Sequence, residues 1–198
     1  MVCNEEIVDG IYNRGFHVVD NFLTDETVKG LRQCALQLIE DNQFQTAKIG
    51  SQQNVSTNQT IRRDKIYWLD ESTENPAIQA YFTAMKALSS SLNEQLFLGL
   101  VEFETHFALY QPESFYKKHI DQFSNKQDRR ISCVYYLNED WQASFGGQLT
   151  LYDKDDNVLT SILPSSNRLV CFSSDLPHEV SKTSEMRLSI AGWMKTRR

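Results

Sequence analysis

Short strand-like segments fill the second half of this chain, and they limit the folds that it can adopt. Phe103, Phe107 and Leu109 alternate with polar or small neighbours, the period-two pattern of a strand with one buried face. Further strand-like runs cover residues 131–137, 148–152, 158–163, 168–172, 178–181 and 186–194, with turn-forming residues at 146–147, 153–157 and 164–167. Many short strands at regular spacing predict an antiparallel barrel or sandwich.

The first half of the chain shows helical periodicity instead. Helical patterns cover residues 7–11, 24–39 and 75–96, and shorter strand-like runs lie at 16–19 and 61–69. Thr24 and Asn75 are candidate N-caps, and Pro76 suits the first turn of the helix that it begins. Helices followed by strands predict an α+β fold, a double-stranded β-helix (the jelly roll of cupin-like proteins) braced by N-terminal helices.

The chain of 198 residues shows no internal repeat and no change of composition that would mark a second domain. We therefore predict one domain over residues 1–198, with helical support mainly in 1–100 and the jelly-roll core mainly in 61–194. Residues 43–60 are rich in Gln, Asn, Ser and Thr. A polar loop of this length predicts a lid over a site, although its composition equally suits a disordered surface segment.

The charge and the cysteines of the chain bear on its partners and its location. A net charge of −6 with dispersed Lys and Arg disfavours nucleic acid as a partner. No apolar run reaches 18 residues and the acidic start lacks an apolar segment, so neither a membrane span nor a signal peptide is expected. Cys3, Cys34, Cys133 and Cys171 form no CxxC pair and are expected to be free thiols, which predicts a cytoplasmic protein.

His119-Ile120-Asp121 and His178 form a candidate metal site, although His178 lies 57 residues after Asp121. Side chains at positions i and i+2 of a strand point to the same side, so His119 and Asp121 can reach one ion together. Two histidines and one carboxylate on one face of a metal are typical of non-haem Fe(II) oxygenases, although Mn(II), Co(II), Ni(II) and Zn(II) also accept such ligands. Taken singly, each residue would more often have a structural role than bind a metal.

Arg187 lies nine residues after His178, inside an otherwise apolar run at 186–194. An arginine is rarely buried without an anionic partner, and its planar guanidinium binds a carboxylate through two hydrogen bonds. Arg187 is therefore a candidate anchor for an acidic co-substrate beside the metal. An arginine on an edge strand, with its guanidinium in solvent, is the alternative.

These residues resemble those of the Fe(II)/2-oxoglutarate-dependent dioxygenases. Within that superfamily the chain is similar to the prolyl hydroxylase domain group, which includes the hypoxia-inducible-factor prolyl hydroxylases and their microbial relatives. The resemblance covers roughly residues 60–194, with ordered local matches at 61–68, 110–121, 134–141, 146–147, 177–180 and 187–193.

The resemblance implies a role for each matched residue. The metal ligands and catalytic residues would be His119, Asp121 and His178. Arg187 would bind the distal carboxylate of 2-oxoglutarate, and the other co-substrate residues would be Tyr136, Tyr110, Ser189 and Trp193. The substrate-side residues would be Arg129, Arg62 and Asp64, with Asp64 pairing with Arg129 to hold the polar loop.

Three departures from the group concern the surroundings of the site. Ala191 stands where relatives often have a threonine near the distal carboxylate, and Ser189 is the candidate replacement. His106 occupies a strand position that is usually apolar in the group, and on a regular strand it shares a face with Tyr110. Arg63 stands where the group usually has glycine. The departures leave the triad intact and the substrate open.

The resemblance implies a dioxygenase that uses Fe(II), 2-oxoglutarate and O2 to hydroxylate a prolyl residue in a protein, releasing succinate and CO2, with ascorbate as a candidate reductant. The partner would be a protein that carries the target proline, a translation or regulatory factor as for relatives. Alternatives are hydroxylation of a small molecule or of a non-prolyl protein residue, and a catalytically silent binding module of the same fold. The intact triad and Arg187 disfavour the silent module.

Overall fold

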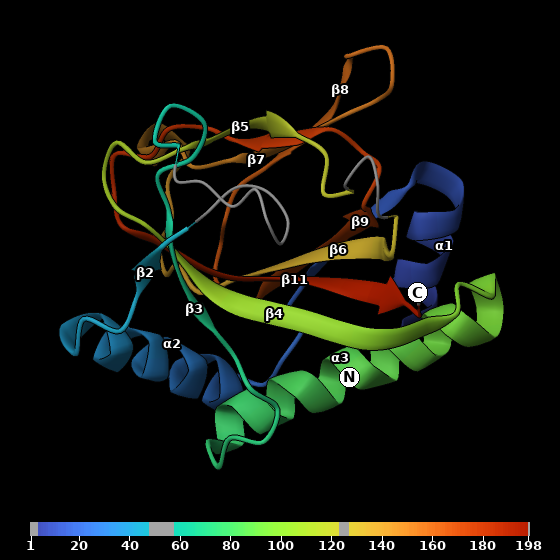
Figure 1. Ribbon diagram of the computed structural model, residues 1–198, viewed down its shortest axis with the longest axis horizontal. Helices are drawn as coiled ribbons and strands as arrows, with labels where there is room; N and C mark the ends of the chain where they lie inside the picture. Colours follow the sequence, from blue (N-terminus) through green and yellow to red (C-terminus); the bar gives the residue numbers. More distant parts are fainter. Residues whose placement is uncertain (1–3, 48–57, 123–126, 198) are drawn as a thin grey trace.

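The computed structural model describes residues 4–47, 58–122 and 127–197, which form two facing antiparallel sheets with helices on the outside of the larger one (Figure 1). The helices are α1 (Asn4–Arg14), α2 (Asp25–Glu40) and α3 (Pro76–Leu96), with a short 3-10 turn, η1 (Ala143–Phe145). The strands are β1 (Phe16–Asp20), β2 (Gln45–Thr46), β3 (Lys65–Trp68), β4 (Leu100–Tyr110), β5 (Tyr116–His119), β6 (Arg129–Tyr136), β7 (Leu149–Tyr152), β8 (Val158–Ile162), β9 (Arg168–Ser173), β10 (His178–Val180) and β11 (Arg187–Thr196). The architecture is the predicted α+β double-stranded β-helix.

The strand order determines which residues face each other inside the jelly roll. The larger sheet has the order β1-β9-β6-β11-β4-β3-β2, and the smaller sheet has the order β5-β10-β7-β8. Strand β11 lies between β4 and β6, and Arg187 at its start pairs with Tyr110 of β4. In the smaller sheet, His178 at the start of β10 lies directly opposite His119 at the end of β5. Each sheet therefore brings together residues that are far apart in the sequence.

The two longer helices begin at the predicted caps and pack against the outer face of the larger sheet (Figure 1). The Thr24 hydroxyl accepts a hydrogen bond from the Thr27 amide at 3.3 Å. The Asn75 side chain accepts hydrogen bonds from the amides of Ala77 and Ile78 at 3.0 and 3.2 Å. These contacts satisfy amide donors that the first turn of a helix leaves unpaired. None of the helices that the structure describes combines the length and apolar character that crossing a bilayer requires.

The apolar core lies between the helices and the larger sheet, where Leu31, Leu88 and Ile190 are fully buried. Alternation along β6 separates this core from the interior of the jelly roll. Ile131, Cys133 and Tyr135 belong to the core beside the helices, whereas Ser132, Val134 and Tyr136 lie toward the space between the sheets. A shift of one residue therefore decides whether a side chain stabilises the core or lines the interior.

Two segments differ from the sequence-based expectation. Strand β5 has no counterpart among the predicted strand-like runs, because Lys117 and Lys118 interrupt its apolar pattern. The predicted polar loop 43–60 contains β2, which pairs with β3, and its residues 48–57 lie outside the described residues. The prediction of a lid there stays a prediction.

Replacing Leu88 by alanine tests the core between α3 and the larger sheet. Leu88 is fully buried, so we expect Leu88→Ala to lower the free energy of unfolding by about 2–5 kcal/mol through lost burial and a cavity. Urea unfolding followed by circular dichroism measures the change. Leu159→Ala, at a side chain that is 40% exposed on β8, is the matched control and should cost less than about 0.5 kcal/mol. Equal losses for the two variants would contradict the assigned core.

Candidate metal centre and co-substrate pocket

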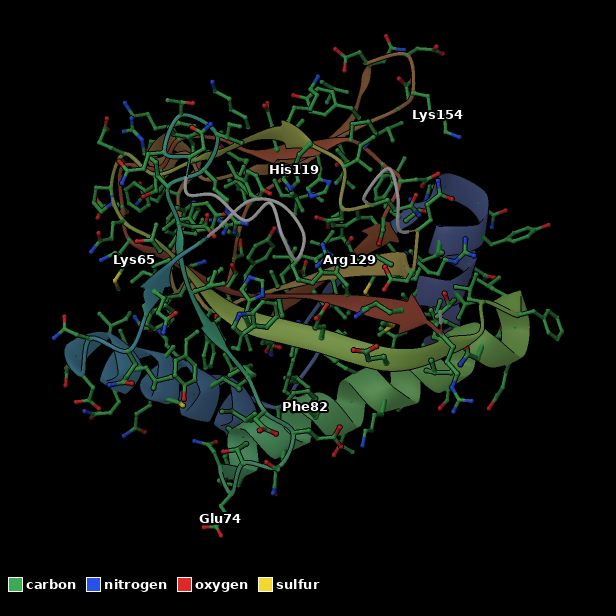
Figure 2. The ribbon with its side chains drawn as sticks, viewed as in Figure 1. Lys65, Glu74, Phe82, His119, Arg129 and Lys154 are labelled. Atoms are coloured by element: carbon green, nitrogen blue, oxygen red, sulfur yellow. The ribbon has the colours of Figure 1, made fainter. Side chains whose placement is uncertain are left out.

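A cavity of about 990 Å³ opens between the two sheets, and it collects most of the predicted site residues. Its lining includes Arg62, Asp64, Tyr110, His119, Asp121, Arg129, His178, Arg187, Ser189 and Trp193. Tyr136 is buried behind this lining, beside Arg187. Figure 2 shows that His119 of the smaller sheet and Arg129 of the larger sheet lie on opposite sides of the interior.

Three candidate metal ligands meet at one place in this cavity. The pairing of β5 with β10 sets His119 beside His178, with ring centroids 4.2 Å apart. Asp121 follows the end of β5, and its carboxylate oxygens lie 3.6 Å from Nε2 of His119 and 3.5 Å from Nε2 of His178. The three ligand atoms lie within 4.8 Å of one another, a spacing that one ion can bridge. The i, i+2 relation of His119 and Asp121 thus spans the end of a strand rather than its middle.

Backbone carbonyl groups orient both imidazole rings. Nδ1 of His119 lies 2.7 Å from the carbonyl oxygen of Lys117, and Nδ1 of His178 lies 3.0 Å from that of Leu176. Because a carbonyl oxygen only accepts, the ring proton belongs on Nδ1 and Nε2 keeps its lone pair. Each Nε2 is therefore free to bind a metal. The other ring nitrogen donates to a backbone carbonyl, as it usually does in histidines that bind metals.

The carboxylate of Asp121 is held by a chain of two hydroxyl groups. Ser132 donates to Oδ2 of Asp121 at 2.7 Å, and the hydroxyl of Ser174 lies 2.9 Å from that of Ser132. Burial acts to raise the pKa of Asp121, but the neighbouring His178 and His119 together with hydrogen bonds from Ser132 and Trp193 lower that pKa overall. Burial lowers the pKa of His119. An ionised carboxylate and a neutral imidazole are the forms that bind a divalent metal, and this donor set fits Fe(II).

Arg187 places an uncompensated positive charge deeper in the same cavity, where the side chain is 1% exposed. Its Nε donates to the carbonyl oxygen of Gly147 at 2.9 Å, and Nη1 donates to the Ser189 hydroxyl at 3.2 Å. The guanidinium carbon lies 4.8 Å from the centre of the Tyr110 ring and 5.0 Å from that of Tyr136. Among the residues that the structure describes, no carboxylate forms an ion pair with Arg187. A buried cation in this state suits an anionic ligand.

The hydroxyl of Tyr136 adds a polar atom beside this cation. It is buried and has no hydrogen-bond partner in the described part of the chain. Burial raises the pKa of Tyr136, with the charge of Arg187 opposing the rise. The hydroxyl is therefore protonated at neutral pH and free to donate to a carboxylate bound by Arg187.

An aromatic stack supports the metal-ligand end of the cavity. The ring of Tyr116 lies parallel to that of His119, with centroids 3.6 Å apart, and the Arg62 guanidinium covers the other side of Tyr116 at 4.3 Å. Arg62 is fixed by two hydrogen bonds to the carboxylate of Asp64, at 2.7 and 2.5 Å. Asp64 therefore holds Arg62 against Tyr116, and Tyr116 in turn packs against His119 and limits the rotation of its ring.

Arg129 and Trp193 form the opposite wall near Asp121. The guanidinium carbon of Arg129 lies 3.5 Å from the centre of the Trp193 ring, and Nη1 donates to the backbone carbonyl of Asp121 at 3.3 Å. A carboxylate oxygen of Glu104 lies 3.8 Å from Nη2 of Arg129. The predicted pairing of Asp64 with Arg129 is wrong, because the Asp64 carboxylate binds the nearer guanidinium of Arg62 instead.

Several residues that contact the candidate site were not among those predicted from the sequence. Ser132 could have been found, since it shares a face of β6 with Tyr136 by period-two alternation. The stacking of Tyr116 on His119 within β5 and the contact of Ser174 after β9 depend on local geometry that the sequence pattern does not reveal. Gly147 was assigned only to a turn. Its φ is +70°, and a Cβ there would lie 3.0 Å from Cδ of Arg187. Glycine therefore leaves the space that the Arg187 side chain occupies.

Comparisons with known proteins agree with this geometry. The sequence profile of the 2OG-Fe(II) oxygenase superfamily matches residues 105–195. Egl nine homolog 1 of Homo sapiens is 31% identical over 96% of this chain, and the hypoxia-inducible factor prolyl hydroxylase of Caenorhabditis elegans is 28% identical over 96%. These alignments cover 46% of the human protein and 28% of the nematode protein, so the chain spans half or less of these two curated relatives.

Two solved structures share the whole fold. A prolyl-4-hydroxylase of Pseudomonas putida has a TM-score of 0.88 and 35% identity, with 98% of this chain and 99% of that chain covered. A prolyl hydroxylase of Trichoplax adhaerens, solved with a peptide fragment of the hypoxia-inducible factor oxygen degradation domain, has a TM-score of 0.88 and 30% identity, with 97% and 88% covered. Fold, site and sequence thus agree, and the chain belongs to the 2OG-Fe(II) oxygenase superfamily, within its group of prolyl hydroxylases.

Proposed function

We propose that this chain is a protein prolyl hydroxylase that uses Fe(II), 2-oxoglutarate and O2. The observation that carries the proposal is the arrangement of one cavity. It holds two histidines and a carboxylate at one place and, at another, a buried arginine that has no carboxylate partner among the described residues. A dicarboxylate co-substrate needs both features. Bound at the metal through its 2-oxo acid end, it would present its second carboxylate to the arginine.

In this proposal His119, Asp121 and His178 hold Fe(II) and leave the other coordination positions for co-substrate and O2. When bound, the iron and 2-oxoglutarate supply the oxidising chemistry, in which one oxygen atom of O2 enters the target carbon and the other enters succinate as CO2 is released. The chain's own task is to orient these groups. The carbonyl contacts of the two histidines and the Ser132 hydroxyl fix the ligands without assistance from the metal.

The distal carboxylate would be bound by Arg187, Ser189 and Tyr136, and Tyr110 would help to orient the co-substrate near its chelating end. The guanidinium brings charge, and the buried hydroxyl of Tyr136 brings a donor that lacks a partner in the described protein. Apolar side chains of the cavity, among them Leu149, Phe172 and Val180, keep water from this charge and so strengthen its attraction for a carboxylate.

The protein substrate would enter where exposed apolar side chains line the cavity. Trp68 is 51% exposed and Ile120 is 49% exposed, and both contribute to the lining. Exposed apolar side chains at a pocket mouth suit a peptide segment that carries a proline ring. Arg62, Arg129 and Trp193 line the cavity beside the metal ligands and would contact the segment. The relative from Trichoplax adhaerens, solved with a peptide, supports a protein as substrate.

We also propose a cytoplasmic location, supported by the cysteines. The Sγ atoms of Cys133 and Cys171 lie 3.5 Å apart in facing positions of β6 and β9, and both residues are free thiols. Such a pair suits a reducing compartment.

Removal of a metal ligand tests the proposed metal centre. We expect His178→Ala to lower Fe(II)-dependent succinate formation by more than ~100-fold. Loss of a group that only hydrogen-bonds a metal ligand already lowers metal affinity or activity about 10–100-fold. Anaerobic titration with Mn(II) should show the matching loss of metal affinity. His17→Ala, in the outer strand β1, is the control and should behave as the wild type. Metal affinity retained by His178→Ala would remove His178 from the ligand set.

Replacement of the buried arginine tests the co-substrate anchor. We expect Arg187→Met to raise the KM for 2-oxoglutarate roughly 30-fold or more, since truncating one partner of a buried charge pair costs about 2–5 kcal/mol. Arg168→Met is the matched control, because Arg168 pairs with Asp20 at the outer edge of the larger sheet. An equal KM for the two variants would show that Arg187 does not bind the co-substrate.

Mass spectrometry of proteins from the source cells tests the activity itself. Cells that carry the wild-type chain are compared with cells that carry His119→Ala. We expect a prolyl peptide that gains the mass of one oxygen atom only with the wild type. Oxygen gained at another residue type would keep the oxygenase and overturn the prolyl assignment. Identical peptide masses in both cell lines would overturn a protein substrate.

A further inference from the structure

His106 is a buried polar residue that the proposed chemistry does not use. It lies on β4, is 3% exposed and lines the cavity. Its Nδ1 is buried without a hydrogen-bond partner, and the imidazole ring forms no hydrogen bond with any described residue. Burying an unsatisfied polar group costs free energy, so such a residue calls for an explanation.

Packing alone does not account for an imidazole at this position. The ring packs against two tryptophans that also contact each other. Its centroid lies 4.8 Å from that of Trp68 and 5.5 Å from that of Trp193, and the centroids of the two tryptophans lie 6.5 Å apart. A phenyl ring or a methionine would fill the same place without bringing polar atoms. The imidazole differs from these side chains only in offering one hydrogen-bond donor and one acceptor.

The register of the larger sheet locates His106 relative to the two ends of the proposed site. His106 lies opposite Trp68 of β3 and opposite Ala191 of β11. On the pocket face of β11, Ala191 comes between Ser189, which contacts Arg187, and Trp193, which lies beside Arg129. The methyl group of Ala191 is small and leaves the space above it open for a ligand.

The charges around His106 belong to the proposed substrate residues and to one candidate metal ligand. Those with the strongest influence on its protonation are Asp64, Arg62, Arg129 and Asp121, and Arg187 is not among them. Burial, the largest effect, lowers the pKa of His106 to about 4. The ring is thus neutral at physiological pH. Trp68, its neighbour, is half-exposed, so the mouth of the cavity opens beside it.

We propose that His106 is a specificity-determining residue, which hydrogen-bonds a polar group of the bound protein substrate beside Trp68 and Trp193. This inference rests on the proposed function. The group would be a backbone amide or a neutral polar side chain next to the target proline, since a neutral imidazole recognises such groups through donor and acceptor at once. The two tryptophans would hold the apolar part of the same segment.

Two variants of similar shape isolate this hydrogen bond. His106→Met fills the space without a strong donor or acceptor, and His106→Gln fills it with both. The probe is protein extract from source cells that carry His119→Ala, in which target prolines are unmodified. Purified wild type and each variant are incubated with this extract, Fe(II) and 2-oxoglutarate, and rates of prolyl oxygenation are measured by mass spectrometry. Affinity for 2-oxoglutarate is measured separately on the Mn(II)-loaded proteins.

We expect His106→Met to lower the rate on the wild-type target at least ~10-fold at limiting extract concentration, because it leaves a substrate group unpaired. His106→Gln should restore most of that rate, and affinity for 2-oxoglutarate should stay within about two-fold for both variants. Equal rates for wild type and His106→Met would overturn the assignment of His106 alone. A loss in both variants, or a matching loss of 2-oxoglutarate affinity, would also overturn it. No oxygenated proline even with wild type would overturn the proposed function together with this inference.

Discussion

The pairing of β11 between β4 and β6 is the interaction on which the rest of this structure depends. The strand contributes Leu188 and Ile190 to the core beneath the larger sheet, while Arg187 and Ser189 line the cavity above it. Because side chains alternate, a slip of one residue would bury the wrong set on each face. The hydrophobic effect that fixes this register therefore also places Arg187, the proposed co-substrate anchor. The stability of the core and the position of this arginine thus have one structural cause.

The electrostatics of the cavity follow from that placement. Arg187 is buried without a carboxylate partner in the described chain, and Asp121 is buried as an anion among histidines. Each charge is costly unless a ligand of opposite sign joins it. A divalent metal beside Asp121 and a carboxylate beside Arg187 would compensate both. Desolvation strengthens the attraction of each buried charge for a ligand of opposite sign, which favours a metal beside Asp121 together with an acidic co-substrate beside Arg187.

The sequence predicted the parts of the fold that depend on local periodicity and missed those that depend on contacts between distant segments. Period-two alternation identified β4, β6, β9 and β11, and the cap residues identified α2 and α3. The short strand β5 escaped because its lysines interrupt the apolar pattern, although it carries His119. The sequence also did not predict that Asp64 pairs with Arg62 rather than with Arg129. That pairing depends on the isolated β-bridge between Arg62 and Tyr116, which positions the segment before β3.

The face of the larger sheet that lines the cavity carries different side chains at successive positions. Arg187, the proposed co-substrate anchor, pairs with Tyr110, and Trp193 pairs with Ser132, whose hydroxyl donates to Asp121. His106 pairs with Ala191 between these positions, and its buried Nδ1 has no hydrogen-bond partner among the described residues. Under the role that we propose for His106, a substitution at this position would change the polypeptide that the cavity accepts. It would leave the residues of the proposed metal and co-substrate sites unchanged.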